Sequence, residues 1–489
     1  MFESFSYVLK SFVEAKGTNI LQASEKIGVS RQKFYRFMEG IAFPSEEEFN
    51  ELCRVIRPSI NEKSRLINAY NMTKVGPIVY ETRLCVESLI TKVSNANSEL
   101  SAAIRVPDKP AQQSDLVLLN KLEVGAAVAD MFRFDDCDSL TIYILAQPDS
   151  DVLVESLKYV LKQSTVKTTV HHGVRLSTSV GAVENVGNFA KVVPLLFIRN
   201  DNVRYSFKYH YASELSNNKF SEIYPNIIIR NQRALLLSSE MSTGIVLNSS
   251  EQVELLTNDV DNVMHRMEPI SHFHDSLDNL CDFYAQLTEV DFKEAYYFEQ
   301  QPCVEFLNPE RYRRYIEENQ PLVYELMVKR YNSFIKHLND RASYHQLFTR
   351  RGIDLLLKDH LHLDIPRGVF DEAAMAKLMP EFLEEITELA THNDNFSLYM
   401  APNDFLDINL SGCVVVVLSG YCVTITDNPL LEYNRSPILV IREEGVVNAF
   451  AEYFSSLIDK NKIQDEKTYI SNTSGALEYI KQRLADDNK

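Results

Sequence analysis

The chain has 489 residues, which is more than one hydrophobic core usually supports, so we expect about three domains. Apolar residues make up 45% and charged residues 24% of the sequence, as in ordinary globular proteins, which argues against long disorder. We expect no secretory signal, because residues 1–10 lack a basic region followed by an apolar one. We also expect no contact with a membrane, because the most apolar run, residues 413–418, is far shorter than the roughly 18 residues that a span needs.

The cysteines favour a reducing compartment. There are seven, an odd number, and no two are spaced as C-x-x-C. Scattered cysteines are typical of reduced thiols that pack as small hydrophobic side chains in the cytoplasm. We therefore expect a cytoplasmic protein, and no motif in the sequence indicates a cofactor.

The negative charge of the chain is unevenly distributed. The formal net charge is −18, which would argue against nucleic acid as a partner if the chain were one body. Residues 1–75, however, contain 11 basic and 9 acidic residues, whereas residues 76–489 contain 39 basic and 59 acidic ones. An acidic body repels DNA and would confine contact to the small N-terminal part, although it also simply favours solubility.

Five short helical patterns, separated by start and stop signals, occupy residues 1–75 and predict one compact domain. Asn19, Ser30 and Ser45 are placed to cap the second, third and fourth helices, and Glu48 completes a capping box with Ser45. Apolar residues of the first helix recur at the spacing of a buried stripe. The helices are expected at residues 4–15, 19–28, 31–39, 45–57 and 59–72.

The rest of the chain alternates between helical and strand patterns, which is typical of α/β folds. Residues 101–114 are rich in Ala, Pro, Gln and Ser and are interpreted as an exposed linker. We divide the remainder into a connecting helix and linker, a first α/β module, a helical connector and a second α/β module. Their predicted ranges are 76–115, 116–270, 271–345 and 346–489.

The two α/β segments end alike, with short strands followed by an amphipathic helix. In the first segment, strands near residues 234–237 and 244–247 precede the helix. In the second segment, strands near residues 413–418, 422–425 and 438–441 precede it. Because internal repeats change the domain assignment, this pattern suggests two copies of one module.

The second and third helices are predicted to pack closely. Gly28 permits a left-handed turn between them, and the small side chain of Ser24 allows the two helices to approach. Val29, Phe34 and Phe37 are expected to fill the space between them. The remaining side chains of the third helix then face outward.

The outward face of the third helix carries three cations, an amide and a phenol, residue types that contact base edges and phosphates. Arg can bridge guanine O6 and N7, and Gln can bridge adenine N6 and N7. The candidate DNA-binding residues are Ser30, Arg31, Gln32, Lys33, Tyr35 and Arg36.

Residues 23–45, ASEKIGVSRQKFYRFMEGIAFPS, resemble the helix-turn-helix of the Cro and phage-repressor (XRE) family of transcriptional regulators. The resemblance covers the N-terminal domain only, and Ala23, Met38 and Ile20 depart from the residues usual in the family. It implies a five-helix lambda-repressor-like domain that binds double-stranded DNA, with Arg31, Gln32 and Arg36 at the positions that usually meet bases. It also implies a homodimer, since such heads usually bind two half-sites about one helical turn apart.

Weaker signals concern metals and catalysis. His360 and His362, followed by Asp364, are spaced so that they would lie on one side of an extended segment and bind a divalent metal, but packed histidines are much commoner. The α/β segments resemble the degenerate phospholipase D-like sensor domains of some bacterial regulators, and the His-x-Lys signature of the active enzymes is absent from the sequence. Neither a glycine-rich phosphate loop nor G-x-S-x-G nor H-E-x-x-H is present, so no motif predicts an enzyme.

We therefore expect a multidomain protein of α plus α/β class, with the helix-turn-helix domain followed by two α/β sensor-like modules joined by helices. The predicted function is a sequence-specific transcriptional regulator whose C-terminal body dimerises and binds a small-molecule or peptide effector. The main alternative is a protein-interaction adaptor whose helical head docks a protein, and a third is a metal enzyme using His360 and His362.

Overall fold

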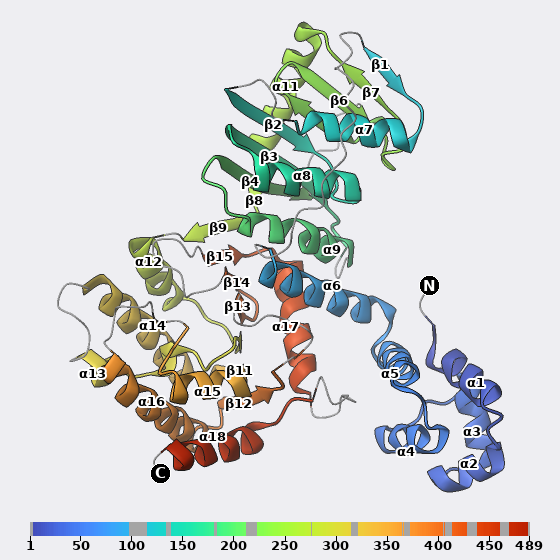
Figure 1. Ribbon diagram of the computed structural model, residues 1–489, viewed down its shortest axis with the longest axis vertical. Helices are drawn as coiled ribbons and strands as arrows, with labels where there is room; N and C mark the ends of the chain where they lie inside the picture. Colours follow the sequence, from blue (N-terminus) through green and yellow to red (C-terminus); the bar gives the residue numbers. More distant parts are fainter. Residues whose placement is uncertain are drawn as a thin grey trace. The chain divides into compact units, whose positions relative to one another are not determined.

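A computed structural model describes residues 3–96, 115–133, 138–179, 183–211, 223–274, 276–313, 321–363, 365, 372–403, 405, 413–427, 438–459 and 469–487 (Figure 1). The chain divides into two compact units, residues 1–84 with 452–470 and residues 85–451 with 471–489. The linker predicted at residues 101–114 lies outside the described residues. In the described part, no helix is both long enough and apolar enough to cross a membrane.

The first unit contains the five helices predicted between residues 1 and 75. Ser4, Asn19, Ser30, Ser45 and Ser59 cap their N-termini through side-chain oxygens, which satisfies backbone amides that no helical carbonyl can reach. One buried face of each helix contributes to a single core. The helices are α1 (Phe5–Ala15), α2 (Ile20–Ile27), α3 (Arg31–Met38), α4 (Glu46–Ile56) and α5 (Ile60–Val75), and α6 (Pro77–Ser94) follows.

Two left-handed glycines determine where α3 lies in this unit. Gly28 (φ 77°) ends α2, and Gly40 (φ 73°) follows the last turn of α3. A residue with a Cβ strains in this conformation, because its side chain approaches the following carbonyl oxygen. The chain therefore turns sharply at both ends of a helix that is only eight residues long.

The second unit begins with an eight-stranded sheet of order β1-β7-β6-β5-β2-β3-β4-β8. Strands β2, β3 and β4 are parallel, and β5, β6, β7 and β1 extend the sheet by antiparallel pairing. The strands are β1 (Leu116–Leu118), β2 (Ser139–Leu145), β3 (Lys167–Leu176), β4 (Val203–Tyr211), β5 (Asn226–Arg230), β6 (Arg233–Leu237), β7 (Gly244–Leu247) and β8 (Glu268–Pro269). The helices that accompany them are α7 (Lys121–Met131), α8 (Asp151–Gln163), α9 (Val183–Val192), the 3-10 helix η1 (Val193–Phe197) and α11 (Ser250–His265).

Successive side chains of a strand point to opposite faces, so this sheet has a hydrophobic layer on each face. Leu140, Ile142 and Ile144 of β2 pack with the buried residues of α7 and α8, whereas Tyr143 and Leu145 pack with those of α11. Figure 1 accordingly shows α7 and α8 on one face of the sheet and α11 on the other. The sheet is therefore the middle layer of an α/β sandwich.

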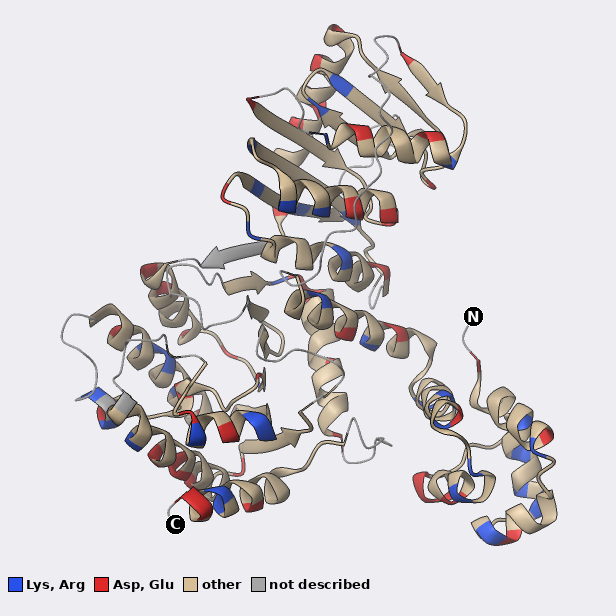
Figure 2. Ribbon diagram, viewed as in Figure 1, with Lys and Arg blue, Asp and Glu red and all other residues tan. Residues whose placement is uncertain are grey.

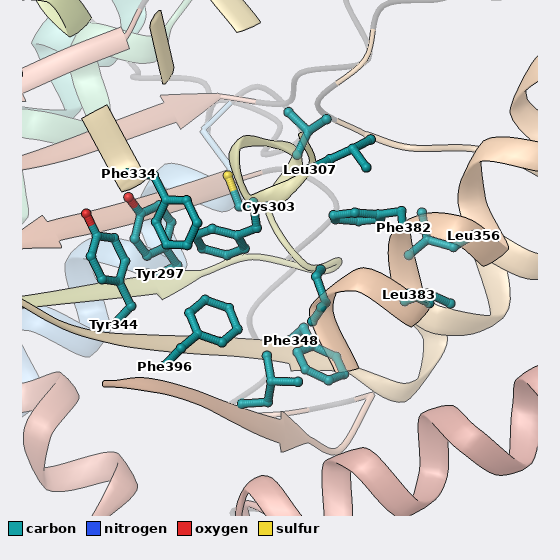
Figure 3. Close-up of a cluster of buried hydrophobic side chains, with 14 of the residues drawn as sticks. Tyr297, Cys303, Leu307, Phe334, Tyr344, Phe348, Leu356, Phe382, Leu383 and Phe396 are labelled. Carbon is teal, nitrogen blue, oxygen red and sulfur yellow. The ribbon is translucent and has the colours of Figure 1, made fainter. Parts of the chain in front are cut away.

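A seven-stranded sheet of order β12-β11-β10-β13-β14-β15-β9 forms the other part of the second unit. Its large core joins aromatic side chains of the sheet to the helices that cover it (Figure 3). The strands are β9 (Ser271–His274), β10 (Glu294–Phe298), β11 (Ser343–Thr349), β12 (Phe396–Ala401), β13 (Cys413–Leu418), β14 (Cys422–Asp427) and β15 (Ile438–Ile441). The helices are α12 (Leu277–Leu287), η2 (Val304–Phe306), α13 (Pro309–Tyr312), α14 (Pro321–Asn339), α15 (Arg350–Lys358), α16 (Glu372–His392) and α18 (Thr473–Asp487). Helix α17 (Glu444–Ile458) begins in this unit, and its residues from 452 onward belong to the first unit.

Seven strands have the same order in both sheets, as a repeated module would require. In each sheet three parallel strands are followed in the chain by three antiparallel ones. A strand that precedes all six in the chain pairs with the last of them. Strands β2 to β7 therefore correspond to β10 to β15, and β1 corresponds to β9. The third parallel strand of each sheet also has a partner on its outer side. Strand β4 pairs with β8, and Met400 of β12 forms an isolated β-bridge with Ser471. Helices α11 and α17 follow the last strand in each copy.

A cross-strand row of side chains extends the correspondence to single residues. In the first sheet, Tyr143, His171 and Ser206 are neighbours on β2, β3 and β4. The Tyr143 and His171 rings stack with centroids 5.1 Å apart, and His171 Nδ1 lies 2.9 Å from Ser206 Oγ. Burial lowers the pKa of His171, so the neutral imidazole is favoured.

The second sheet places the same three residue types in the same register. Tyr296, His345 and Ser397 are neighbours on β10, β11 and β12, and the Tyr296 and His345 rings stack with centroids 5.0 Å apart. Burial again lowers the pKa of the histidine. The two modules therefore carry three identical residues at equivalent positions, although the sequence around them differs.

The helical connector predicted at residues 271–345 differs from the structure, which places β9 and β10 there along with α12 and α14. Strand β10 lies inside the seven-stranded sheet, paired on both sides. A strand buried on both faces shows no alternation of polar and apolar residues. A run of five mostly apolar residues can belong to a strand or to a helix, so the sequence alone does not identify β10. The second sheet therefore begins at residue 271 and not at residue 346.

His172 of β3 is a buried histidine held in one tautomer. Its ring is 1% exposed, and Nε2 lies 2.9 Å from the carbonyl oxygen of Ala146, so this nitrogen carries the proton and donates it. Nδ1 then accepts a hydrogen bond from the Tyr205 hydroxyl at 2.9 Å. Burial lowers the pKa of His172 from 6.5 to about 4, because the charged ring would lose its hydration.

Replacing Gly28 by Ala is expected to destabilise the first unit by about 1–2 kcal/mol, because Ala strains in the left-handed region. Gly125→Ala is a matched control in the interior of α7, where the added Cβ would lie 3.8 Å from Val152 Cγ2, an ordinary contact. It should stabilise its helix by about 0.5–1 kcal/mol. Hydrogen–deuterium exchange of peptides from α2, α3 and α7 measures both effects, and unchanged exchange in α2 and α3 of the Gly28 variant would contradict the prediction.

Acid is expected to destabilise the first sheet through His172. The unfolded chain binds a proton below pH 6.5 whereas the folded chain does so only near pH 4, so this contribution to stability is present above pH 6.5 and is lost as the pH falls towards 4. The loss amounts to up to about 3 kcal/mol. Urea denaturation at about pH 7 and about pH 4.5 should show a smaller pH effect for His172→Gln than for the wild type, while His265→Gln, at an exposed site, should behave as the wild type.

Candidate nucleic-acid interface

The orientation of α3 about its axis is set by two phenylalanines. Phe34 and Phe37 are fully buried and belong to the core of the first unit. Because residues three apart lie on the same side of a helix, their burial turns the opposite side towards solvent. That side carries Gln32 and Arg36, which are exposed, and Tyr35, which is exposed by 36%. Arg31 is also exposed, because it is the first residue of the helix.

Ser30 begins the helix. Its hydroxyl oxygen accepts a hydrogen bond from the backbone N–H of Lys33 at 3.1 Å, as the sequence predicts. Of the six residues predicted to contact DNA, Ser30 therefore has a structural role that needs no ligand.

A solvent-open hollow of about 680 Å³ lies along the exposed side of α3. The structure brings together four of the six predicted residues there and adds two that the prediction did not include. The lining residues are Arg31, Gln32, Tyr35, Arg36, Glu39 and Ile41. Figure 2 shows the basic segments of α3 and the acidic start of α4 within the same unit.

The polar groups of the hollow differ in how they are held. Arg31 lies over the Tyr35 ring, 5.6 Å from its centroid, and its Nη2 donates to the Tyr35 hydroxyl at 3.4 Å. This contact, one turn apart on the helix, pre-orders the guanidinium. The side chains of Gln32 and Arg36 make no hydrogen bond or ion pair within the described residues, so their donors face solvent.

Lys33 is placed differently from the other cations of α3. Its ammonium forms an ion pair with Glu48 of α4 and lies 5.7 Å from the centroid of the Phe37 ring. Desolvation alone would raise the pKa of Glu48, but hydrogen bonds from Lys33 and from the Ser45 backbone lower it below its usual value. Lys33 is thus partly neutralised and does not line the hollow.

Aromatic packing supports the turn that follows α3. Phe43 stacks on Tyr70 of α5 with centroids 4.5 Å apart, and the Tyr70 hydroxyl donates to the Pro44 carbonyl oxygen at 3.1 Å. Burial raises the pKa of Tyr70 to about 12, so the hydroxyl remains protonated and continues to donate. The end of the segment that leads into α4 is therefore held against α5.

Two hollow residues, Glu39 and Ile41, lie beyond the stretch that the sequence predicted to meet DNA. The signal that points to them is Gly40, which reverses the chain directly after the helix and returns Ile41 to the last turn. Both residues therefore lie outside the outward-facing positions of α3 from which the site was predicted.

The histidines considered for a metal site do not form one within the described residues, where no group of three His, Cys, Asp or Glu side chains converges. His362 is fully buried, and its Nε2 donates to the Pro302 carbonyl oxygen at 3.0 Å. Asp364 lies outside the described residues, and His360 has a left-handed backbone (φ 48°). His362 therefore serves the packing of its module.

No protein-family model matches the chain, and no curated protein matches its sequence. Solved structures match weakly: phosphatidylserine synthase from Haemophilus influenzae Rd KW20 is 10% identical at a TM-score of 0.23, covering 81% of this chain and 98% of that one. Polyphosphate kinase from Porphyromonas gingivalis is 9% identical at 0.23, covering 79% and 59%. The archaeal chromatin protein TrmBL2, described as showing a novel mode of DNA binding, is 10% identical at 0.20, covering 55% and 100%. Scores this low carry no functional argument.

Ser30→Ala is expected to fray the start of α3 and to cost about 1 kcal/mol, because the Lys33 amide loses its acceptor. Ser64→Ala, an exposed position inside α5, is the matched control and should be neutral or slightly stabilising, since Ala is the better helix former. Hydrogen–deuterium exchange of peptides covering α3 and α5 tests both variants. Equal exchange of α3 in the Ser30 variant and the wild type would show that the cap contributes nothing.

Proposed function

We propose that the chain is a sequence-specific DNA-binding transcriptional regulator in which α2 and α3 form a helix-turn-helix and α3 enters the major groove. The observation that carries the proposal is the hollow on α3, where two arginines, a glutamine and a tyrosine face solvent together. These side chains have the donor patterns that recognise guanine and adenine edges. The resemblance of residues 23–45 to the Cro and phage-repressor family supports the same function.

The contacts within the first unit favour base recognition over general attraction to phosphate. Gln32 and Arg36 lie one turn apart on the exposed side of α3, and neither side chain has a polar partner within the described residues. Burying these side chains costs free energy unless the ligand replaces hydrogen bonds that they make to water. A base edge offers a matching pair of partners, because Arg and Gln can each form two parallel hydrogen bonds to it.

The acidic remainder of the chain fits this function. Residues 76–489 carry 20 more acidic than basic residues, so they are repelled by a polyanion and leave the N-terminal unit to make the contact. A single head binds one half-site weakly, so the proposal includes a homodimer. We assign dimerisation and binding of a small-molecule or peptide effector to the two α/β modules, and the proposed protein is cytoplasmic and not an enzyme.

Arg31→Ala and Arg36→Ala are each expected to weaken binding to the preferred duplex by roughly tenfold to a hundredfold, since a bidentate contact to guanine is worth about 1–3 kcal/mol. The duplex is first selected from a random pool with the full-length protein at physiological salt, and affinity is then measured by fluorescence anisotropy. Arg54→Ala removes the same charge from α4, outside the hollow, and should change affinity by less than about threefold.

Two outcomes of this experiment would overturn the proposal. If no duplex is enriched, or if the retained duplexes share no sequence and dissociate with salt, the head does not recognise DNA specifically. If both Arg31→Ala and Arg36→Ala retain wild-type affinity, α3 is not the recognition helix. A salt-independent complex with a protein would instead support the adaptor.

A further inference from the structure

The turns that end α2 and α3 have the same backbone hydrogen bonds but place the next side chain differently. After Gly28, the Val29 N–H donates to the Ser24 carbonyl oxygen at 3.0 Å, and after Gly40, the Ile41 N–H donates to the Arg36 carbonyl oxygen at 2.9 Å. A hydrophobic residue in this position usually packs against the last turn of its own helix. Val29 is half-buried and packs against the core of the unit in this way.

Ile41 does not follow that rule. It is 63% exposed, and the residue facing it in the last turn of α3 is Arg36 instead of an apolar one. Ile41 therefore lacks the apolar contact with the last turn of its helix that usually explains a hydrophobic residue after a helix-ending glycine.

The exposed position of Ile41 is nevertheless well fixed. The N–H of Ala42 also donates to the Arg36 carbonyl oxygen, at 3.1 Å, so two successive amides join this turn to the end of α3. The stacked pair of Phe43 and Tyr70 holds the following residues. An aliphatic side chain is thus presented to solvent from a hydrogen-bonded turn, whose backbone has little conformational entropy left to lose on binding.

The surroundings of Ile41 specify its partner. It is the one aliphatic residue among the six that line the hollow, and it lies beside the Arg and Gln side chains that are proposed to contact base edges. In the major groove the apolar group that a base pair presents is the C5 methyl of thymine.

We propose that Ile41 determines specificity for thymine by packing against the C5 methyl of a base next to those contacted by α3. The inference rests on the proposed function, because it requires that the hollow faces the major groove. It adds a contact from the turn after the helix to those of the helix itself. Burying one methyl group against Ile41 should strengthen binding by about fourfold.

Uracil provides the direct test, since it pairs as thymine does and lacks only the methyl group. The selected duplex is prepared with deoxyuridine in place of each thymidine in turn, and affinities are measured for the full-length wild type and for Ile41→Ala. At one position, deoxyuridine should weaken wild-type binding about fourfold and leave the binding of Ile41→Ala unchanged. Ile60→Ala, at an isoleucine that is 89% exposed on the same unit, is the control and should keep the wild-type response.

The outcomes separate the inference from the function on which it rests. If the protein selects a duplex but no deoxyuridine weakens binding, or if Ile41→Ala keeps the same sensitivity, then Ile41 does not recognise thymine although the chain binds DNA. If no duplex is selected at all, the proposed function fails and this inference fails with it.

Discussion

The burial of Phe34 and Phe37 is the interaction on which the candidate site depends. Two rings three residues apart fix the rotation of an eight-residue helix, and every polar side chain of the hollow takes its direction from them. So short a helix is not stable alone, because its few internal hydrogen bonds barely compensate the cost of nucleation. The core therefore supplies its stability, while Ser30 and the glycines at positions 28 and 40 determine where it starts and stops.

Side-chain direction also constrains the larger unit, but along its strands the direction repeats every two residues, instead of every 3.6 as on a helix. Because neighbouring residues of a strand face opposite sides, each sheet needs helices on both faces, and the two copies combine such helices with the same strand order. Identity is retained at Tyr143, His171 and Ser206 and at their counterparts, where stacked rings and a short polar side chain must fit across three strands. Elsewhere a hydrophobic side chain of suitable volume is sufficient, so two different sequences can form the same topology.

Much of the first unit could be predicted because its signals are local. Caps at Asn19, Ser30 and Ser45 and apolar residues at helical spacing depend only on near neighbours in sequence, and the helices begin where these residues predict. The second sheet was harder, since β10 is buried on both faces and its partners β11 and β13 lie far along the chain. Ile41 was missed for a different reason: it reaches the hollow through the chain reversal at Gly40, whereas the prediction considered only the outward-facing positions of α3. The pairing of Lys33 with Glu48 joins two helices and has no signature in either one.

That ion pair bears on how the proposed regulator would gain its affinity. A cation partly neutralised by Glu48 contributes less to counterion release from DNA, and the first 75 residues carry a net charge of only +2. Non-specific attraction is therefore weak, and the acidic remainder of the chain weakens it further. Under the proposed function, affinity has to come from contacts that discriminate among bases and from the joining of two heads in a dimer. A methyl contact from a rigid turn suits that requirement, because it adds sequence preference without adding charge.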